Sequence, residues 1–136
     1  MAGGYELLEH QADIGIRAWG DSLGHAYEQT AAGLLEVLGV EPAGRGEART
    51  VRASGRDRAG VLVDFLNELV VLHETEGVAF GAVRVVRLDD SELEAEVPVA
   101  PLAGEPELVV KAATYHQLRV EERADGSGLV EVYLDV

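Results

Sequence analysis

Carboxylates near the two ends of the chain are the first candidates for chemistry. Asp13 lies in a predicted strand, and Asp135 stands beside Val136, whose α-carboxylate would add a third anionic group. Three anions cannot lie close together unless something offsets their repulsion. A cation held by oxygen ligands would do so, and such sites suit Ca²⁺ or Mg²⁺. An alternative stays open in which Asp135 occupies a solvated sheet edge and Asp13 a turn, because the sequence does not show that the ends meet.

A second polar group lies at residues 111–116, which read Lys-Ala-Ala-Thr-Tyr-His and contain the only lysine of the chain. In a strand, Lys111 and Tyr115 would face one way, and Thr114 and His116 the other. Lys111 could pair with the acidic groups or contact a phosphate. The segment could equally be a surface strand with ordinary polar residues.

Several kinds of active site are excluded. The chain has no cysteine, which rules out disulfides, thiolate metal sites and cysteine nucleophiles. It contains no Walker loop, no G-x-S-x-G turn and no H-E-x-x-H helix. Since no acid–base pair is visible either, the sequence favours a protein that assists a partner over one with a complete active site.

Two helices are predicted to position these residues. Asp21 or Ser22 can cap the first, which has apolar residues at helical spacing until Gly39. Asp57 can cap the second, which extends to about residue 76 and ends at Gly77. The second helix has a predicted buried stripe at Val61, Leu62, Phe65, Leu66, Leu69, Leu72 and His73. Outside it are Val63, Val70 and Val71, for which we favour cover by another layer over a partner-facing patch.

The remaining patterns predict strands, and a hairpin around residues 89–91. These strands are predicted at 5–9, 12–19, 47–54, 82–88, 92–99, 107–115, 117–123 and 129–136. Because no regular crossover helices separate them, a doubly wound fold is disfavoured. We predict an α+β fold, a two-layer sandwich with two main helices packed on one face of a mixed β-sheet, in a single domain over residues 1–136.

The formal net charge of −14 narrows the choice of partners. A chain this acidic repels a phosphate backbone, which argues against unaided nucleic-acid binding. Acidity is commonly a solubility device, but it also suits a cation or a basic protein surface. The start of the chain does not resemble a signal peptide, and no apolar run approaches the ~18 residues of a membrane helix. A cytoplasmic protein is expected.

Several stretches resemble signatures of the archease family. Residues 9–16, Glu-His-Gln-Ala-Asp-Ile-Gly-Ile, are similar to its opening signature, and residues 62–69 with 74–77 to its second helix. Residues 111–116 and 134–136 are similar to its C-terminal signatures. The resemblance covers essentially the whole chain, and the order of the motifs makes it specific.

The resemblance implies an accessory protein of tRNA processing that is not itself an enzyme. Archeases assist the RtcB-type RNA ligase, which joins cyclic-phosphate or 3′-phosphate ends to 5′-hydroxyl ends. They promote guanylylation and multiple turnover of the ligase. The ligase would be the partner, RNA would be met only through the ligase, and no membrane would be involved.

The resemblance also implies a divalent metal, most often calcium, with magnesium as the alternative. Its ligands would be Asp13, Asp135 and Val136. Gln11 and Gln117 depart from the family pattern, where threonine and an acidic residue are usual, but neither is a proposed ligand. Candidates for contact with the partner or its nucleotide are His10, Lys111, Thr114 and His116.

Two other functions stay open on the residues. A small metal-dependent phosphoester hydrolase could use Asp13, Asp135, His10 and His116. A chaperone-like binding protein without a metal role could use the valines of the second helix.

Overall fold

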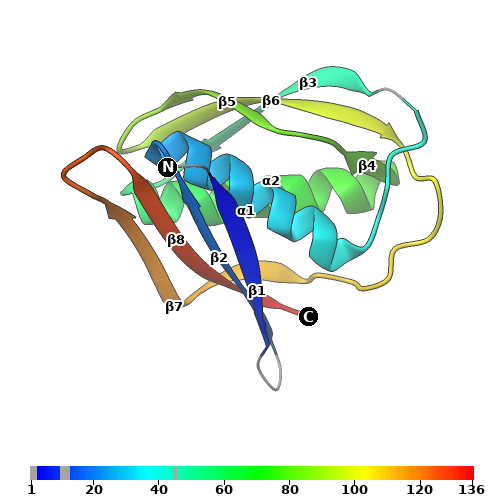
Figure 1. Cartoon of the computed structure of the whole chain (residues 1–136). Coiled ribbons are helices and arrows are strands. Elements are labelled where there is room, and N and C mark those ends of the chain that lie inside the picture. Colours follow the sequence, from blue (N-terminus) through cyan, green and yellow to red (C-terminus); the bar gives the residue numbers. More distant parts are fainter. Residues whose placement is uncertain (1–2, 10–12, 45) are drawn as a thin grey trace.

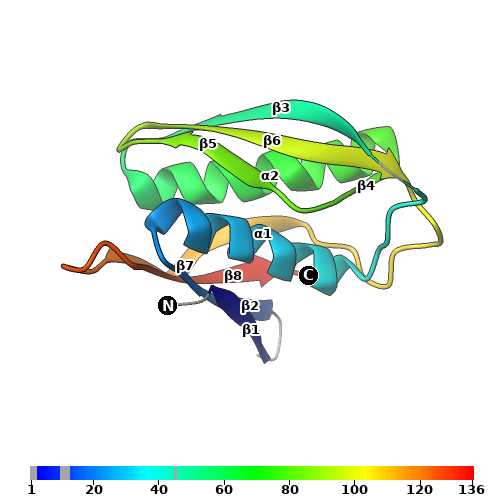
Figure 2. The ribbon, with the colours of Figure 1, turned by 45° about the horizontal axis from the view of Figure 1, so that its top comes forward.

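Two helices lie between two β-sheets in the computed structural model of the chain (Figure 1, Figure 2). The structure describes residues 3–9, 13–44 and 46–136. All strand pairings among these residues are antiparallel. None of the described helices has the length and apolar character needed to cross a membrane.

The first sheet is built from both ends of the chain. It contains β1 (Gly4–Glu9), β2 (Asp13–Gly20), β7 (Ala112–Glu122) and β8 (Gly128–Asp135), in the order β1-β2-β8-β7. The last strand is therefore central in its sheet, held between β2 and β7. This arrangement places the end of β8 beside the start of β2.

The second sheet is built from the middle of the chain. It contains β3 (Glu47–Ser54), β4 (Val78–Phe80), β5 (Arg84–Leu88) and β6 (Glu92–Pro101). β6 is its central strand, with β3 along one edge and both β4 and β5 along the other. The hairpin predicted around residues 89–91 is confirmed as the connection from β5 to β6.

Both helices begin and end where their capping residues predict. The Oγ of Ser22 accepts a hydrogen bond from the backbone N–H of His25 at 3.0 Å and starts α1 (Leu23–Leu38). Asp57 does the same for Gly60 at 2.8 Å and starts α2 (Arg58–Glu76). Gly39 and Gly77 end the two helices at φ 65° and 64°, a left-handed conformation that glycine adopts without steric cost.

The core lies between the layers. α1 packs on β1, β2 and β8 and also reaches β5, whereas α2 packs on β3 and on β7. The predicted stripe of α2 is buried. Val63 and Val70, on another side of α2, are also buried, which confirms cover by a further layer, although Val71 is 52% exposed.

The α+β class with two main helices is confirmed, but the layers differ from the prediction. The strands form two antiparallel sheets with the helices between them, instead of one mixed sheet covered on one face. Alternation shows that a strand has one buried face but does not name its neighbours. Residues 107–111 lie outside any strand, and β7 joins most of the two strands predicted at 107–115 and 117–123.

Candidate metal and partner-binding site

Asp13 and Asp135 are direct partners in the pairing of β2 with β8. Directly opposed residues of an antiparallel pair carry their side chains on the same face of the sheet. The next pair, Ile14 and Leu134, faces the helices, and Leu134 is fully buried. The two aspartates therefore lie on the outer face, which neither helix covers. The two strands meet as the metal hypothesis requires.

The donors at this position suit a hard divalent cation. Asp135 is exposed and Asp13 is half-buried, and like charges directly opposed across a sheet are unfavourable. Over the described ranges, no cluster of three or more His, Cys, Asp or Glu is placed to hold a metal ion. A metal site would need donors beyond the two aspartates, and the carboxylate of Val136 is one that the sequence offers. His10, the other candidate beside Asp13, lies outside the described residues.

Lys111 is fixed next to this pair by its backbone. Its N–H donates to the carbonyl oxygen of Asp135 at 2.8 Å. The Lys111 side chain is exposed. The single lysine of the chain is thus held by its backbone beside the opposed aspartates, where it could reach an anionic group of a partner.

β7 bulges outward just beyond this point. Thr114 pairs with Tyr133, and the next pair is Arg119 with Glu131, so residues 115–118 oppose one residue of β8. The Thr114 hydroxyl donates to the carbonyl of Tyr133 at 3.1 Å, and its oxygen accepts from the N–H of residue 116 at 3.3 Å. Bulges next to functional sites redirect side chains. This one explains why simple alternation does not describe the segment.

Inside the bulge, Gln117 has a φ of 51°, a left-handed conformation that is uncommon outside glycine. The ring of His116 meets the ring of Tyr133 edge-on, with centroids 6.4 Å apart. Thr114 and His116 therefore both lie beside Tyr133 on the outer face. Left-handed backbone conformations at residues other than glycine, such as that of Gln117, cluster at functional sites.

Tyr133 is a site residue that sequence reasoning missed. It belongs to the outer face but is only 4% exposed, because its ring lies over Gly15 of β2. A Cβ at Gly15 would approach the ring to 2.6 Å. Burial and the nearby charge of Glu131 raise the pKa of Tyr133, so its hydroxyl stays protonated and donates to Glu131 at 3.2 Å. A glycine within a predicted strand was the available signal.

Asn67 is a second missed residue. Its Oδ1 accepts from the backbone N–H of Ala113 at 2.8 Å, which ties α2 to β7 between Lys111 and Thr114. Asn67 is the only asparagine of the chain and lies away from the apolar stripe of its helix. That position was the signal, since an amide on an otherwise covered helix needs a polar partner.

The chain is similar to known proteins over nearly its full length. The model of the Archease protein family (MTH1598/TM1083) matches residues 5–136. The chain belongs to the archease family. An archease of Thermococcus gammatolerans is 39% identical over 143 residues, which cover 97% of this chain and 98% of that protein. One of Pyrococcus abyssi is 36% identical over 140 residues, with the same shares covered.

Solved structures of the archease family share the fold. The solution structure of Methanobacterium thermoautotrophicum protein 1598 matches with a TM-score of 0.73 at 31% identity, covering 98% of this chain and 99% of that one. The crystal structure of an archease from Thermotoga maritima, described as a possible chaperone, matches with a TM-score of 0.69. At 24% identity, over 96% of each chain, that likeness concerns the fold alone. Membership of the archease family supports an accessory role for this chain.

Proposed function

We propose that this chain activates an RtcB-type tRNA-splicing RNA ligase, promoting guanylylation and multiple turnover of the ligase in tRNA splicing and RNA repair. Family membership supports the accessory role. The observation that carries the proposal is the register of β2 with β8, which opposes Asp13 and Asp135 on an uncovered face. Asp135 is exposed on that face, where a second protein could contact it.

Asp13, Asp135 and the carboxylate of Val136 would hold a divalent cation, with calcium favoured over magnesium. The ion would supply positive charge that offsets the repulsion between carboxylates. The chain's own part is to hold the ligands in place. The β2–β8 ladder fixes both aspartates, and the ring of Tyr133 over Gly15 keeps the two strands packed beside them.

Complementary charge would bring the two proteins together. The net charge of −14 favours approach to a basic, nucleotide-binding cleft of the ligase and disfavours direct RNA binding. Within the docked complex, Lys111, Thr114 and His116 are the candidates for contact with the ligase or its nucleotide. His10 remains a candidate from the sequence alone. RNA would be met only through the ligase.

The test is RNA ligation by the cognate RtcB-type ligase with limiting enzyme and excess RNA, with and without this chain. We expect a near-stoichiometric reaction to become one of multiple turnover. Asp135→Asn should lose the effect, whereas Glu47→Gln, a matched loss of charge at an exposed residue of β3, should keep it. No stimulation by the unaltered chain in large excess would overturn the proposal. Turnover of phosphoesters by the chain alone would favour a hydrolase instead.

Metal binding is tested separately, by calorimetric titration with Ca²⁺ and Mg²⁺. We expect binding by the unaltered chain, weakened in Asp135→Asn and in a variant extended beyond Val136. Full ligase stimulation by an Asp13→Ala, Asp135→Ala double variant would argue for a binding protein that needs no metal.

A further inference from the structure

One side of α1 is covered by neither sheet. Figure 2 shows this helix with β1 of the first sheet on one side and β5 of the second on the other, and α1 contacts both strands. Ala31 and Leu34 are fully buried, whereas Ala32 and Leu35, the next residues along the helix, are partly exposed. The open side of α1 is therefore apolar at its centre.

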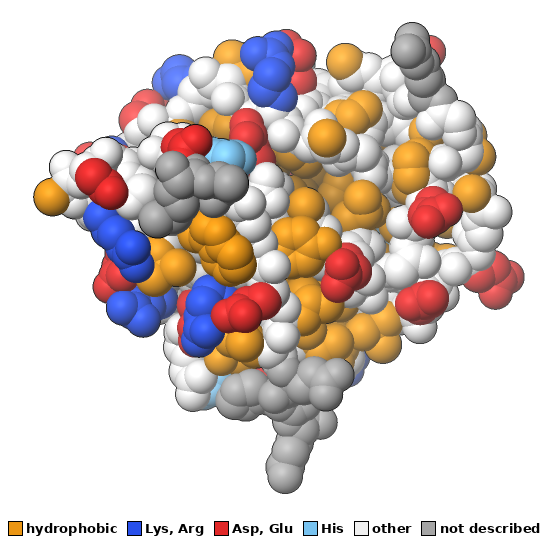
Figure 3. Space-filling model, in the orientation of Figure 1, with side chains coloured by type: hydrophobic (Ala, Val, Ile, Leu, Met, Phe, Trp, Pro, Cys, Tyr) orange, Lys and Arg blue, Asp and Glu red, His pale blue; other side chains and the backbone are white. Residues whose placement is uncertain are grey.

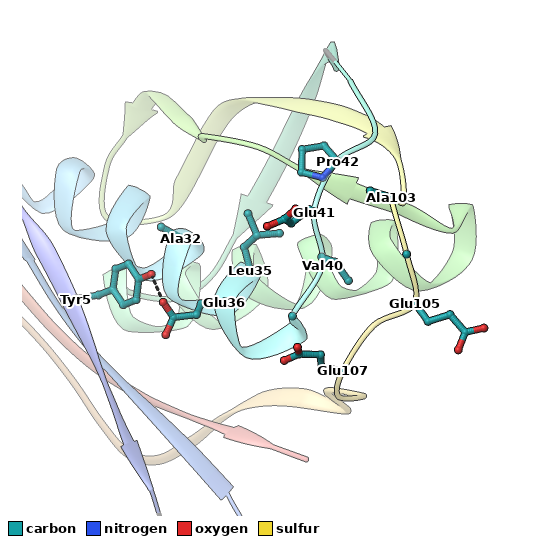
Figure 4. A pocket seen from close by; sticks show the side chains of 12 residues that line it. Tyr5, Ala32, Leu35, Glu36, Val40, Glu41, Pro42, Ala103, Glu105 and Glu107 are labelled. Carbon is teal, nitrogen blue, oxygen red and sulfur yellow. Dashed lines mark hydrogen bonds between the residues drawn. The ribbon is translucent and has the colours of Figure 1, made fainter.

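A hollow of about 720 Å³ lies over the C-terminal half of this side. Its lining includes Ala32 and Leu35 of α1 and Val40, which lies just beyond the end of that helix (Figure 4). Tyr5 of β1 and the segment 103–105 also line it. The hollow is bounded on one side by the edge of the first sheet and on the other by two loops.

A second hollow of about 410 Å³ continues from the first, since both are lined by Ala32 and Leu35. It extends to Ala82 and Val83, in the connection between β4 and β5. We call the two hollows together the α1 groove. Figure 3 shows hydrophobic side chains gathered across the middle of this face of the molecule.

The described charged residues that line the α1 groove, which form its rim, are all acidic. Neither hollow is lined by a described lysine or arginine. The lining includes five glutamates, Glu28, Glu36, Glu41, Glu105 and Glu107. Glu28 accepts from the N–H of Val85 at 2.8 Å, and Glu36 from the hydroxyl of Tyr5 at 2.8 Å.

The other three glutamates of the rim are not compensated within the described part of the chain. The side chains of Glu41, Glu105 and Glu107 are in exposed residues and form no ion pair with any described residue. Some exposed acids outside the groove do form ion pairs, as Glu76 does with Arg49 at 2.7 Å. These exposed carboxylates would attract a binding partner of positive charge.

The apolar residues at the base of the groove (its floor, Ala32 and Leu35) and the glutamates of its rim restrict which kind of molecule could bind there. Nucleic acid is disfavoured by the charge of the rim. A second copy of this chain would also bring a net charge of −14. A polypeptide segment with both apolar and basic side chains matches floor and rim together.

We propose that the α1 groove binds a basic, amphipathic segment of the partner protein. Apolar side chains of the segment would cover Ala32 and Leu35, and its lysines or arginines would face Glu41 and Glu105. The proposal rests on the proposed function, because the partner is taken to be the ligase. It adds a second contact surface, since none of the groove residues belongs to the pair of Asp13 and Asp135.

The affinity of the cognate RtcB-type ligase for this chain tests the proposal, measured by calorimetric titration. We expect Glu41→Lys with Glu105→Lys to weaken binding about tenfold, from two lost ion pairs and the like charge that replaces them. The matched control is Glu47→Lys with Glu74→Lys, which changes the net charge equally at exposed residues away from the groove. Thermal unfolding of both variants checks that the fold is kept.

The outcomes separate the two proposals. Equal weakening by both double variants would overturn the groove and leave the activator role standing, because only overall charge would then matter. No binding by the unaltered chain would overturn both. A photoreactive residue in place of Ala32 should cross-link to a ligase segment that contains lysine or arginine beside apolar residues. Cross-linking to an acidic segment would also overturn the groove proposal.

Discussion

The outer faces of the two sheets differ in which charged residues lie opposite one another on neighbouring strands. On the second sheet, glutamates of β6 face arginines of the neighbouring strands: Glu94 is opposite Arg52, and Glu96 is opposite Arg84 with a 2.8 Å ion pair. On the first sheet, Asp13 is opposite Asp135. The second sheet opposes glutamates with arginines, whereas the first opposes two carboxylates where β2 begins and β8 ends, which we call the acidic end.

The opposition of two carboxylates on the first sheet is local. Two rows away along β2, Arg17 pairs with Glu6 at 2.7 Å and with Glu131 at 2.9 Å. The same strands therefore accommodate balanced pairs in their middle. The difference is one of arrangement: the acidic end opposes two carboxylates, whereas the second sheet places arginines opposite its glutamates, in what we call the balanced lattice.

The largest expected effect concerns the ring that supports the acidic end. Tyr133→Ala removes a buried aromatic side chain and exposes Gly15, which should lower the free energy of unfolding by about 3–4 kcal/mol. Tyr133→Phe keeps the ring and should cost only about 1 kcal/mol. Urea unfolding measures both. Similar losses in the two variants would show that the hydroxyl, and not the ring, supports the strands.

Binding of a cation at the acidic end should raise the free energy of unfolding, and substitutions on the second sheet should not alter that gain. At a hundredfold excess over its dissociation constant, Ca²⁺ should add about 2.7 kcal/mol to the free energy of unfolding. Asp135→Arg should abolish this gain, because it recreates at the acidic end the opposite-charge pairing of the second sheet. Thermal unfolding with Ca²⁺ and with a chelator checks it.

The control for the calcium effect lies on the second sheet. Glu94→Gln removes one acid of the balanced lattice and should leave the response to Ca²⁺ unchanged. If both variants respond as the unaltered chain does, the opposed aspartates are not the calcium site.

Asn67 should contribute measurably to the free energy of unfolding, although it lies away from the apolar stripe of α2. Asn67→Ala leaves the N–H of Ala113 without its acceptor, which should cost about 1–2 kcal/mol. Asn67→Asp keeps an acceptor oxygen and should cost less. Hydrogen exchange at Ala113 reports the contact directly, and unchanged protection in the alanine variant would contradict it.

The smallest effect should come from the balanced lattice itself. Arg84→Gln breaks an exposed ion pair with Glu96 and should change the free energy of unfolding by less than about 1 kcal/mol. Added salt should reduce that difference further. A loss well above this in urea unfolding would mean that the second sheet depends on its charges as strongly as the acidic end does.

Local chemistry predicted the helices well, for identifiable reasons. Ser22, Asp57, Gly39 and Gly77 act through hydrogen bonds and backbone angles within a few residues, and all four lie at the helix ends they indicate. The burial of Val63 and Val70 also follows from the sequence, because a helix that is apolar on more than one side must be covered on more than one side.

The pairing of strands that are distant in the sequence could not be predicted in the same way. Alternating residues in β6 and β8 mark a buried face, but they do not show that the strands belong to different sheets. The bulge at residues 115–118 depends on the hydroxyl of Thr114, the backbone of Tyr133 and the register on either side. None of these is a property of the segment alone.

For the candidate site, the sequence by itself determined which oxygen donors and polar side chains are present and that the chain is acidic. Only the tertiary structure decided that Asp13 and Asp135 are opposed, that Tyr133 covers Gly15, and that α1 keeps an open acidic groove. The physical reason is the separation along the chain of the residues that interact. Caps and alternation arise from neighbours along the chain, whereas a site shared by the first and last strands depends on which strands the packed layers bring together.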